Sequence, residues 1–371
     1  MMLGGSELRR LYLVNAAATP RQKQFAIAIA LVALLGFLMA APFARVHLAQ
    51  LPAFITSYQA ALFFIDLITA LLLFEQFVRL RSSAVLILAT GYLFDAFLIV
   101  PHTLTFPGAF APTGLLGAKM QTTAWLYVFW HGGFSLFVIG YAWLRRREAK
   151  DNLPRVDRPA RAIVLSVASV AVLAIALTAL TTAGHDLLPV VMQNNDYSLL
   201  VTKGVSPAVW ALTLIALVML WHPPQRVVDL WLMLVMWIWL FDIGLSAVIG
   251  SSRFDLGFYA GRIFGLIAAS LLLVTLLVEM LKLYASALGA TANAEMRFAN
   301  LARARRTSSS GPSNGESSEI FAIRENIARY HRFLAAEDLD DTRRRSIERL
   351  LAMEEAKLPP LPQSPEGRSS S

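Results

Sequence analysis

Six side chains in this sequence could carry chemistry, because they place acid, base or charge inside or beside long apolar stretches: Asp66, Asp95, His102, His131, Asp242 and Arg262. Moving a charged side chain into a bilayer is costly, so such residues usually face a ligand, an ion pathway or a proton relay. The residue types and their surroundings therefore predict a ligand site built from these groups.

Helix geometry places most of these groups in one half of the predicted membrane region. With a rise of about 1.5 Å per residue, Asp95, Asp242 and Arg262 fall roughly 8–10 Å below the outer ends of their helices. Asp66 and His131 fall roughly 15 Å below the outer surface by the same rise. We therefore expect the ligand in the outer half of the helical bundle.

Asp242 and Arg262 have two interpretations at this stage. They lie at similar depths on consecutive antiparallel segments joined by a short loop, so they could form an ion pair that holds two helices together. Alternatively, Arg262 faces a cavity that receives an anionic or polar ligand, since an unpaired arginine inside a membrane is costly.

The spacing of the histidines and acids matches no metal-binding motif. His102, His131, Asp66 and Asp95 could in principle hold a metal or relay protons, but no HExxH or other paired-ligand pattern is present. The chain has no cysteine, which excludes disulfides and thiolate sites. Walker A, GxSxG and Rossmann motifs are absent too. We expect no cofactor, no metal and no catalytic residue.

Composition indicates that the bilayer is the solvent for much of the chain. It is 56% hydrophobic and 16% charged, against about 45–50% and about 25% in soluble domains. The net charge of +8 is spread over loops and the C-terminal region, a topological pattern. We therefore expect no binding to nucleic acid.

About eight segments are long and apolar enough to span a membrane, which takes roughly 17–25 residues. This predicts an all-α, polytopic transmembrane helical bundle. The first segment is longer than the ~7–15-residue core of a signal peptide and is interpreted as an anchor. The predicted segments, of which the sixth is short, are 25–42, 56–78, 83–101, 121–144, 161–182, 206–221, 227–249 and 257–284.

Lys and Arg predict the orientation, because they concentrate in cytoplasmic loops. One side of the predicted membrane holds only Arg45, Lys119, Lys203 and Arg253, and the other side holds the remaining basic loops. Eight spans with both termini in the cytoplasm satisfy this rule at every loop, whereas seven spans do not. We expect a multi-pass protein of the inner membrane.

The C-terminal region predicts a small helical hairpin, because apolar residues recur at helical spacing in two short segments separated by a polar turn. A Ser- and Gly-rich stretch before it is typical of a disordered linker. The predicted parts are a cytoplasmic N-terminus (1–24), a membrane sensor domain (25–285), a helical signalling linker (286–306), a disordered linker (307–318), an amphipathic hairpin (319–358) and a disordered tail (359–371).

Three stretches resemble the MASE4 family of bacterial membrane-associated sensor domains: YQAALFFIDLITALLLFEQF (58–77), GYLFDAFLIVPHTLTFPGAFAPTGLLGAKMQTTAWLYVFWHGGF (91–134) and DLWLMLVMWIWLFDIGLSAVIGSSRFDLGFYAGRIFGL (229–266). The resemblance covers most of residues 25–285 and includes loops as well as apolar runs. It implies an integral-membrane input module with an unidentified ligand. Family members usually carry a histidine kinase or diguanylate cyclase domain after the last helix, and this chain has neither signature.

We therefore expect a membrane sensor without enzymatic activity that signals through its last helix and tail. Expected partners are the lipid bilayer, a small ligand, a cytoplasmic signalling protein bound by residues 319–358, and a second copy of the chain. An ion- or proton-coupled transporter using Asp66, Asp95 and Asp242 is an alternative, although no inverted repeat supports it. A haem or metal protein using His102 and His131 is another.

Overall fold

The computed structural model describes residues 17–151, 156–221, 226–250, 252–309, 318–335 and 341–358. The predicted tail (359–371), residues 1–16 of the predicted N-terminus and residues 310–317 of the predicted linker lie outside these ranges. The chain divides into two compact units, Met1–Ala285 and Ser286–Ser371. Regular structure in the described ranges is helical, which confirms the predicted all-α class.

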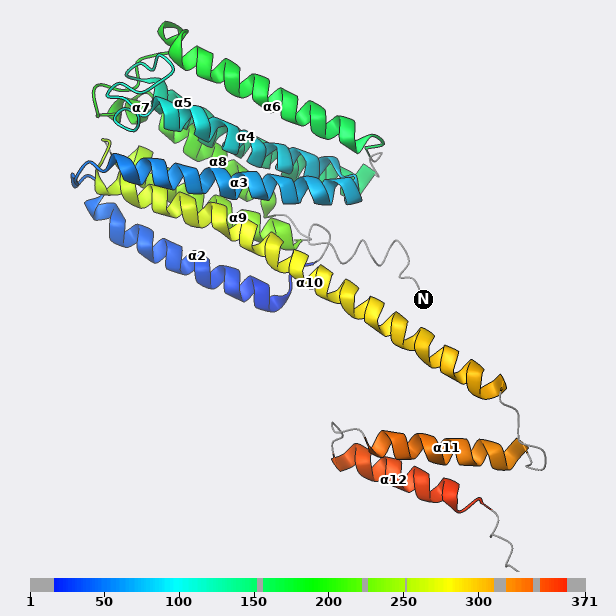
Figure 1. Cartoon of the computed structure of the whole chain (residues 1–371). Coiled ribbons are helices and arrows are strands. Elements are labelled where there is room, and N and C mark those ends of the chain that lie inside the picture. The colour runs from blue at the N-terminus through cyan, green and yellow to red at the C-terminus, as the bar shows by residue number, and fades with distance from the viewer. Residues whose placement is uncertain are drawn as a thin grey trace, which may run out of the picture. The chain divides into compact units, whose positions relative to one another are not determined.

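The first unit is a bundle of long helices, in which the longer connecting loops follow α4 and α6 (Figure 1). Its helices are α2 (Pro20–Ala40), α3 (Pro52–Leu80), α4 (Ser83–Thr105), α5 (Thr122–Asp151), α6 (Pro159–Thr182), α7 (Ser198–Thr202), α8 (Val205–Leu220), α9 (Val227–Ile243) and the part of α10 (Leu256–Ser309) up to Ala285. A π-helical segment, Gly244–Ile249, continues α9. Helix α4 passes through Pro101 and ends one turn later than predicted.

The loops that follow α2, α4, α6 and α9 meet at one end of this bundle, which we call the outer end after its predicted orientation. Leu48 N donates to Phe254 O at 2.9 Å, and Arg253 N donates to Asn195 O at 2.9 Å. The Gln121 side chain accepts from Val191 N at 2.6 Å. At the opposite, inner end, Val156 N donates to Arg81 O at 3.2 Å.

Helix α8 crosses the bundle although it is short. Seven helices in the described ranges have the length and apolarity of a membrane span, and α8 falls below that length. The loop before α8 lies at the outer end, however. Helix α9 begins after Arg226 and runs back to the outer end. The chain therefore passes through the bundle eight times, and both residue 17 and the exit of α10 lie at the inner end.

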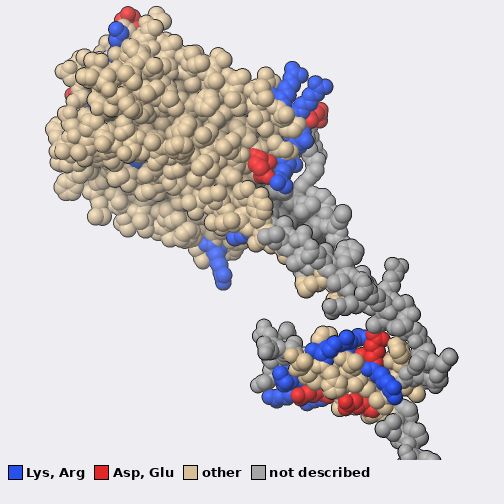
Figure 2. Space-filling model, viewed as in Figure 1, with Lys and Arg blue, Asp and Glu red and all other residues tan. Residues whose placement is uncertain are grey.

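Helix α9 occupies the centre of the bundle, and α2 and α6 lie at its edge (Figure 1). The most apolar window of α9 is 83% buried, compared with 6% for α2 and 11% for α6. Helices α4 and α5 pack closely because Gly91 and Gly133 leave room for Phe137 and Phe94. The broad face in Figure 2 is almost entirely free of charged side chains between the two ends of the bundle, as expected of a lipid-facing surface.

The second unit contains a pair of contacting helices, α11 (Ser318–Leu334) and α12 (Asp341–Glu355). Asn326 Nδ2 donates to Glu354 Oε1 at 2.9 Å across this pair. Ile323 is buried between the helices, and most other residues are exposed. This pair is the small helical hairpin of the predicted fold class.

Candidate functional site

His131 and Asp242 form a buried pair in the outer half of the bundle. His131 Nε2 lies 3.3 Å from Asp242 Oδ2, and His131 Nδ1 lies 3.0 Å from the carbonyl oxygen of Tyr127. Because a carbonyl only accepts, Nδ1 carries a hydrogen. The two ring nitrogens of His131 therefore contact Tyr127 on the same helix and Asp242 on α9.

Helix α10 approaches this pair closely because it has glycines at two successive turns. A Cβ at Gly261 would lie 2.7 Å from Asp242 Oδ1, and one at Gly265 would lie 2.9 Å from Asp242 Oδ2. Small residues spaced four apart allow transmembrane helices to pack at short distance. The position of α10 is therefore coupled sterically to the Asp242 carboxyl group.

Three of the predicted acids and bases line one small cavity, which we call the inner cavity. It has a volume of about 10 Å³ and is lined by Tyr58, Leu62, Asp66, Trp130, His131, Trp239, Asp242, Gly265 and Ala269. This volume corresponds to about one water molecule. The inner cavity can therefore serve proton transfer but is too small for an organic ligand.

Asp95 is fully buried but does not line the inner cavity. Trp130 faces its carboxyl group, but the indole N–H and both carboxyl oxygens lack hydrogen-bond geometry among the described residues. Asp66 is its electrostatic neighbour on α3.

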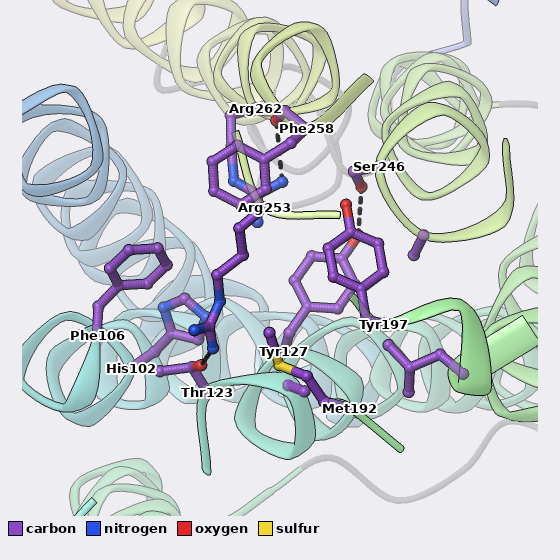
Figure 3. Close-up of a pocket in the computed structure, with 13 residues that line it drawn as sticks. His102, Phe106, Thr123, Tyr127, Met192, Tyr197, Ser246, Arg253, Phe258 and Arg262 are labelled. Atoms are coloured by element: carbon purple, nitrogen blue, oxygen red, sulfur yellow. Dashed lines mark hydrogen bonds between the residues drawn. The ribbon is translucent and has the colours of Figure 1, made fainter. Parts of the chain in front are cut away.

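A second cavity lies directly below the outer loops, and we call it the outer cavity (Figure 3). Its volume is about 40 Å³. Side chains from the C-terminal end of α4, from α5, from the segment before α8 that includes α7, from the π-helical segment, from the α9–α10 loop and from the start of α10 line it. They are His102, Phe106, Thr123, Ala124, Tyr127, Met192, Tyr197, Leu200, Ser246, Ala247, Arg253, Phe258 and Arg262.

Arg253 reaches into this cavity from the loop between α9 and α10, toward His102 and Thr123 (Figure 3). Its guanidinium group donates to Thr123 Oγ1 and lies 5.3 Å from the centre of the Phe106 ring. Burial, and to a smaller extent the charge of Arg262, lowers the pKa of Arg253 to about 10. Arg253 is therefore positively charged at neutral pH.

Arg262 lines the same cavity from the second turn of α10. Its Nη1 donates to Phe258 O at 3.0 Å, and its guanidinium carbon lies 3.5 Å from the centre of the Phe258 ring. Asp242 pairs with His131 and not with Arg262. Of the two interpretations offered by the sequence, the geometry matches an arginine that faces a cavity.

A chain of hydrogen bonds connects the two cavities. Tyr127 and Ser246 share a hydrogen bond of 2.9 Å between their hydroxyl oxygens. Ser246 Oγ also lies 3.2 Å from Asp242 Oδ1, and Asp242 contacts His131. Ser246 belongs to the π-helical segment, and such segments are frequent at functional sites.

The predicted residues thus divide between two cavities and do not share one pocket. Asp66, His131 and Asp242 line the inner cavity, and His102 and Arg262 line the outer cavity. Asp95 is adjacent to the inner group. Nδ1 of His102 accepts from the Gln59 amide, which ties α4 to α3 at the outer cavity.

Sequence reasoning missed several polar residues of these cavities: Tyr58, Thr123, Tyr127, Tyr197, Ser246 and Arg253. Burying a hydroxyl group costs much less free energy than burying a charge. A hydroxyl group in an apolar helix is therefore a weaker indication of a functional site. Arg253 was assigned only as a loop cation, although its neighbour Phe254 and the short loop indicate burial. Asp229 was missed too; it is buried and accepts hydrogen bonds from Tyr141 at 2.7 Å and from Arg145.

The sequence was compared with known families, curated proteins and solved structures. Residues 49–284 match MASE4, described as a membrane-associated sensor, integral membrane domain. The chain belongs to the MASE4 family. The match covers both cavities and ends one residue before the boundary between the two compact units. The comparisons with curated proteins and with solved structures gave no match.

The MASE4 match makes this chain a multi-pass membrane protein with a sensor domain. Helix α2 and the α11–α12 pair lie outside the matched residues. Among the described residues, no group of three or more His, Asp or Glu side chains has the geometry of a metal site. The two cavities of the MASE4 domain are lined by two arginines, an imidazole–carboxyl pair and several hydroxyl groups.

Proposed function

We propose that this MASE4 chain binds a small ligand in the outer cavity and transmits the binding event through α10. The observation that carries the proposal is the origin of the lining residues. Arg253, Phe258 and Arg262 come from the last loop and the first two turns of α10. A ligand in the outer cavity would therefore contact the helix that leaves the bundle.

A ligand can move α10 only if it binds two arrangements of the helices with different affinity. Some of the residues that line the outer cavity belong to α10 and its preceding loop, and others belong to segments that α10 would move against. Met192 and Tyr197 lie on the loop before α8, and Arg253 and Arg262 lie at the start of α10. A ligand that draws these groups together favours one position of α10. The glycine contacts then carry the change to Asp242.

We further propose that the inner end faces the cytoplasm of a bacterial cell and that the membrane is the inner membrane. The distribution of basic residues supports this orientation, because the outer end carries few of them. In this orientation α11 and α12 are available to a cytoplasmic signalling protein or to a second copy of the chain.

A single-cysteine reporter tests the sensing proposal, since the chain contains no native cysteine. Lys282→Cys, whose side chain is 63% exposed on α10, is spin-labelled in lipid nanodiscs. Acetate, glycerol and methylammonium serve as anionic, neutral and cationic probes. We expect at least one probe to change the mobility of the label.

Two variants separate a cavity effect from a solvent effect. Ala124→Leu fills the outer cavity and should abolish the response, whereas Ala168→Leu, on the exposed face of α6, should preserve it. A label that ignores every probe, or a response that survives Ala124→Leu, would contradict the proposed function.

Proton-coupled transport is a second candidate, because the hydrogen-bonded chain from Tyr127 to His131 joins the two cavities. At the inner end, however, Asp229 is satisfied by Tyr141, Arg145 and the Arg226 amide. Proton flux in reconstituted vesicles that disappears in Asp66→Asn would favour this candidate over sensing.

A further inference from the structure

The outer cavity contains two cationic groups whose contacts in the described part of the chain are with neutral partners. Arg253 contacts the Thr123 hydroxyl and the Phe106 ring, and Arg262 contacts the Phe258 carbonyl and ring. The described ion pairs include neither arginine. With a pKa of about 10, Arg253 keeps its charge at neutral pH.

The acids near this cavity have other partners. Asp255 accepts from Ser252 N at 3.1 Å and Phe258 N at 2.6 Å, and so caps the start of α10. Asp242 contacts His131. Asp196 accepts from Ser198 N at 2.7 Å. The protein therefore leaves the two guanidinium groups without a carboxylate of their own.

Tyr197 adds a third donor to the same cavity. Its side chain is only 7% exposed, and its hydroxyl group has no hydrogen-bond partner among the described residues. Burial raises the pKa of Tyr197, so the hydroxyl keeps its proton. A buried donor without an acceptor costs about 1–3 kcal/mol unless a bound group accepts from it.

The size of the cavity limits what it can accept. A volume of about 40 Å³ corresponds to roughly three water molecules at ~10–15 Å³ each. Drug-sized ligands need cavities of about 300–1,000 Å³. The site fits an anion of a few heavy atoms, whose oxygens can accept from two guanidinium groups and a phenol.

We propose that the outer cavity is a binding site for a small oxyanion, either a short carboxylate or an inorganic anion, held by Arg253, Arg262 and Tyr197. This inference rests on the proposed function and specifies the class of its ligand. Anion charge between the two arginines removes their mutual repulsion and draws the α9–α10 loop toward Thr123. It thereby provides the differential contact that a sensor requires.

The test measures thermal unfolding of the full chain in nanodiscs during titration with acetate, nitrate or phosphate, at constant ionic strength set by potassium gluconate. A ligand that binds the folded state raises the unfolding midpoint in proportion to its occupancy. We expect saturable stabilisation by at least one anion. Stabilisation by acetate alone identifies a carboxylate ligand, and stabilisation by nitrate or phosphate alone identifies an inorganic one.

Variants assign the effect to the outer cavity. Arg253→Gln and Arg262→Gln should each raise the Kd at least tenfold, whereas Lys203→Gln, which removes an exposed charge from the same end, should change it less than twofold. Tyr197→Phe removes only the hydroxyl group and should raise the Kd severalfold without lowering the midpoint measured without anion, because the unpartnered donor is lost with it. This last variant keeps the test valid if an arginine variant does not fold.

The inference is overturned if no anion stabilises the protein, or if the arginine variants and Tyr197→Phe respond like the parent. Failure of the anion site remains distinguishable from failure of the sensor. A spin label on α10 that responds to glycerol or methylammonium, with no response to any anion, retains the sensing function and excludes the oxyanion.

Discussion

At the residue scale, the structure of the site depends on which partner each buried acidic or basic side chain contacts. Asp242 contacts His131 and not Arg262, and Arg262 lines the outer cavity. The depths of these residues were predictable from helix rise. Their partners were not, because His131 is 111 positions away from Asp242 and apolar periodicity does not specify which helices touch.

The buried pair predicts a large difference between two otherwise similar His–Asp contacts. Asp242→Asn removes the charge partner of a buried imidazole and should cost about 3 kcal/mol in unfolding free energy. The control is Asp186→Asn, since Asp186 contacts His185 at 3.1 Å but is 89% exposed and should cost less than about 1 kcal/mol. Denaturant unfolding in mild detergent measures both, and equal losses would refute the assignment.

The pKa of Arg253 predicts how anion affinity depends on pH. Only the protonated guanidinium group attracts an anion, so the affinity for the anion should be constant from roughly pH 6 to roughly pH 9. The affinity should fall as the pH rises through about 10. Bound anion favours protonation, so the fall begins at or above that value. Calorimetric titrations across this range check the sign, and affinity that increases with pH would contradict it.

At the element scale, apolar length predicted the helices better than it predicted their contacts. The long spans lie where the sequence placed them, and α4 extends past Pro101 because neighbouring helices surround that turn. No pattern in the sequence predicted the π-helical segment after α9. The close approach of α9 and α10 depends on Gly261 and Gly265, because both face Asp242. Their spacing in the sequence does not by itself predict which helix they contact.

The glycine contacts predict a localised clash. Gly261→Ala places a methyl group within 2.9 Å of Asp242 O as well as its carboxyl oxygen, so the backbone must shift, at a cost of about 1–3 kcal/mol. Gly289→Ala is the control on the same helix, because a Cβ there meets nothing within 4 Å. Thermal unfolding of both variants should show a loss only for Gly261→Ala; a loss of similar size in both would exclude the contact as its cause.

At the scale of the whole molecule, the sequence was sufficient for the all-α bundle of membrane-spanning helices. It was insufficient for the site, because the outer cavity combines residues from several loops and helices far apart in the chain. Arg253 illustrates the limit: a cation in a short loop is ordinarily solvated, and only the meeting of the outer loops buries it.

The eight-pass path predicts which residues share a side of the membrane. Single cysteines at Lys23, Arg158 and Lys282 should react alike with a membrane-impermeant reagent, and cysteines at Lys119 and Lys203 should react oppositely. Labelling in intact cells and in inverted vesicles measures this. The same labelling pattern at Arg158 and Lys203 would mean that α6 does not cross the membrane.

The central claim, that an anion in the outer cavity moves α10, is tested most directly by a distance between two labels. Lys150→Cys on α5 and Lys282→Cys on α10 report this distance by pulsed electron spin resonance in nanodiscs, with and without a saturating anion. The account predicts that the anion shifts the distance distribution in this double-cysteine protein and leaves it unchanged after Arg253→Gln. A distribution that does not respond to the anion in the first protein, or responds equally in both, would contradict it.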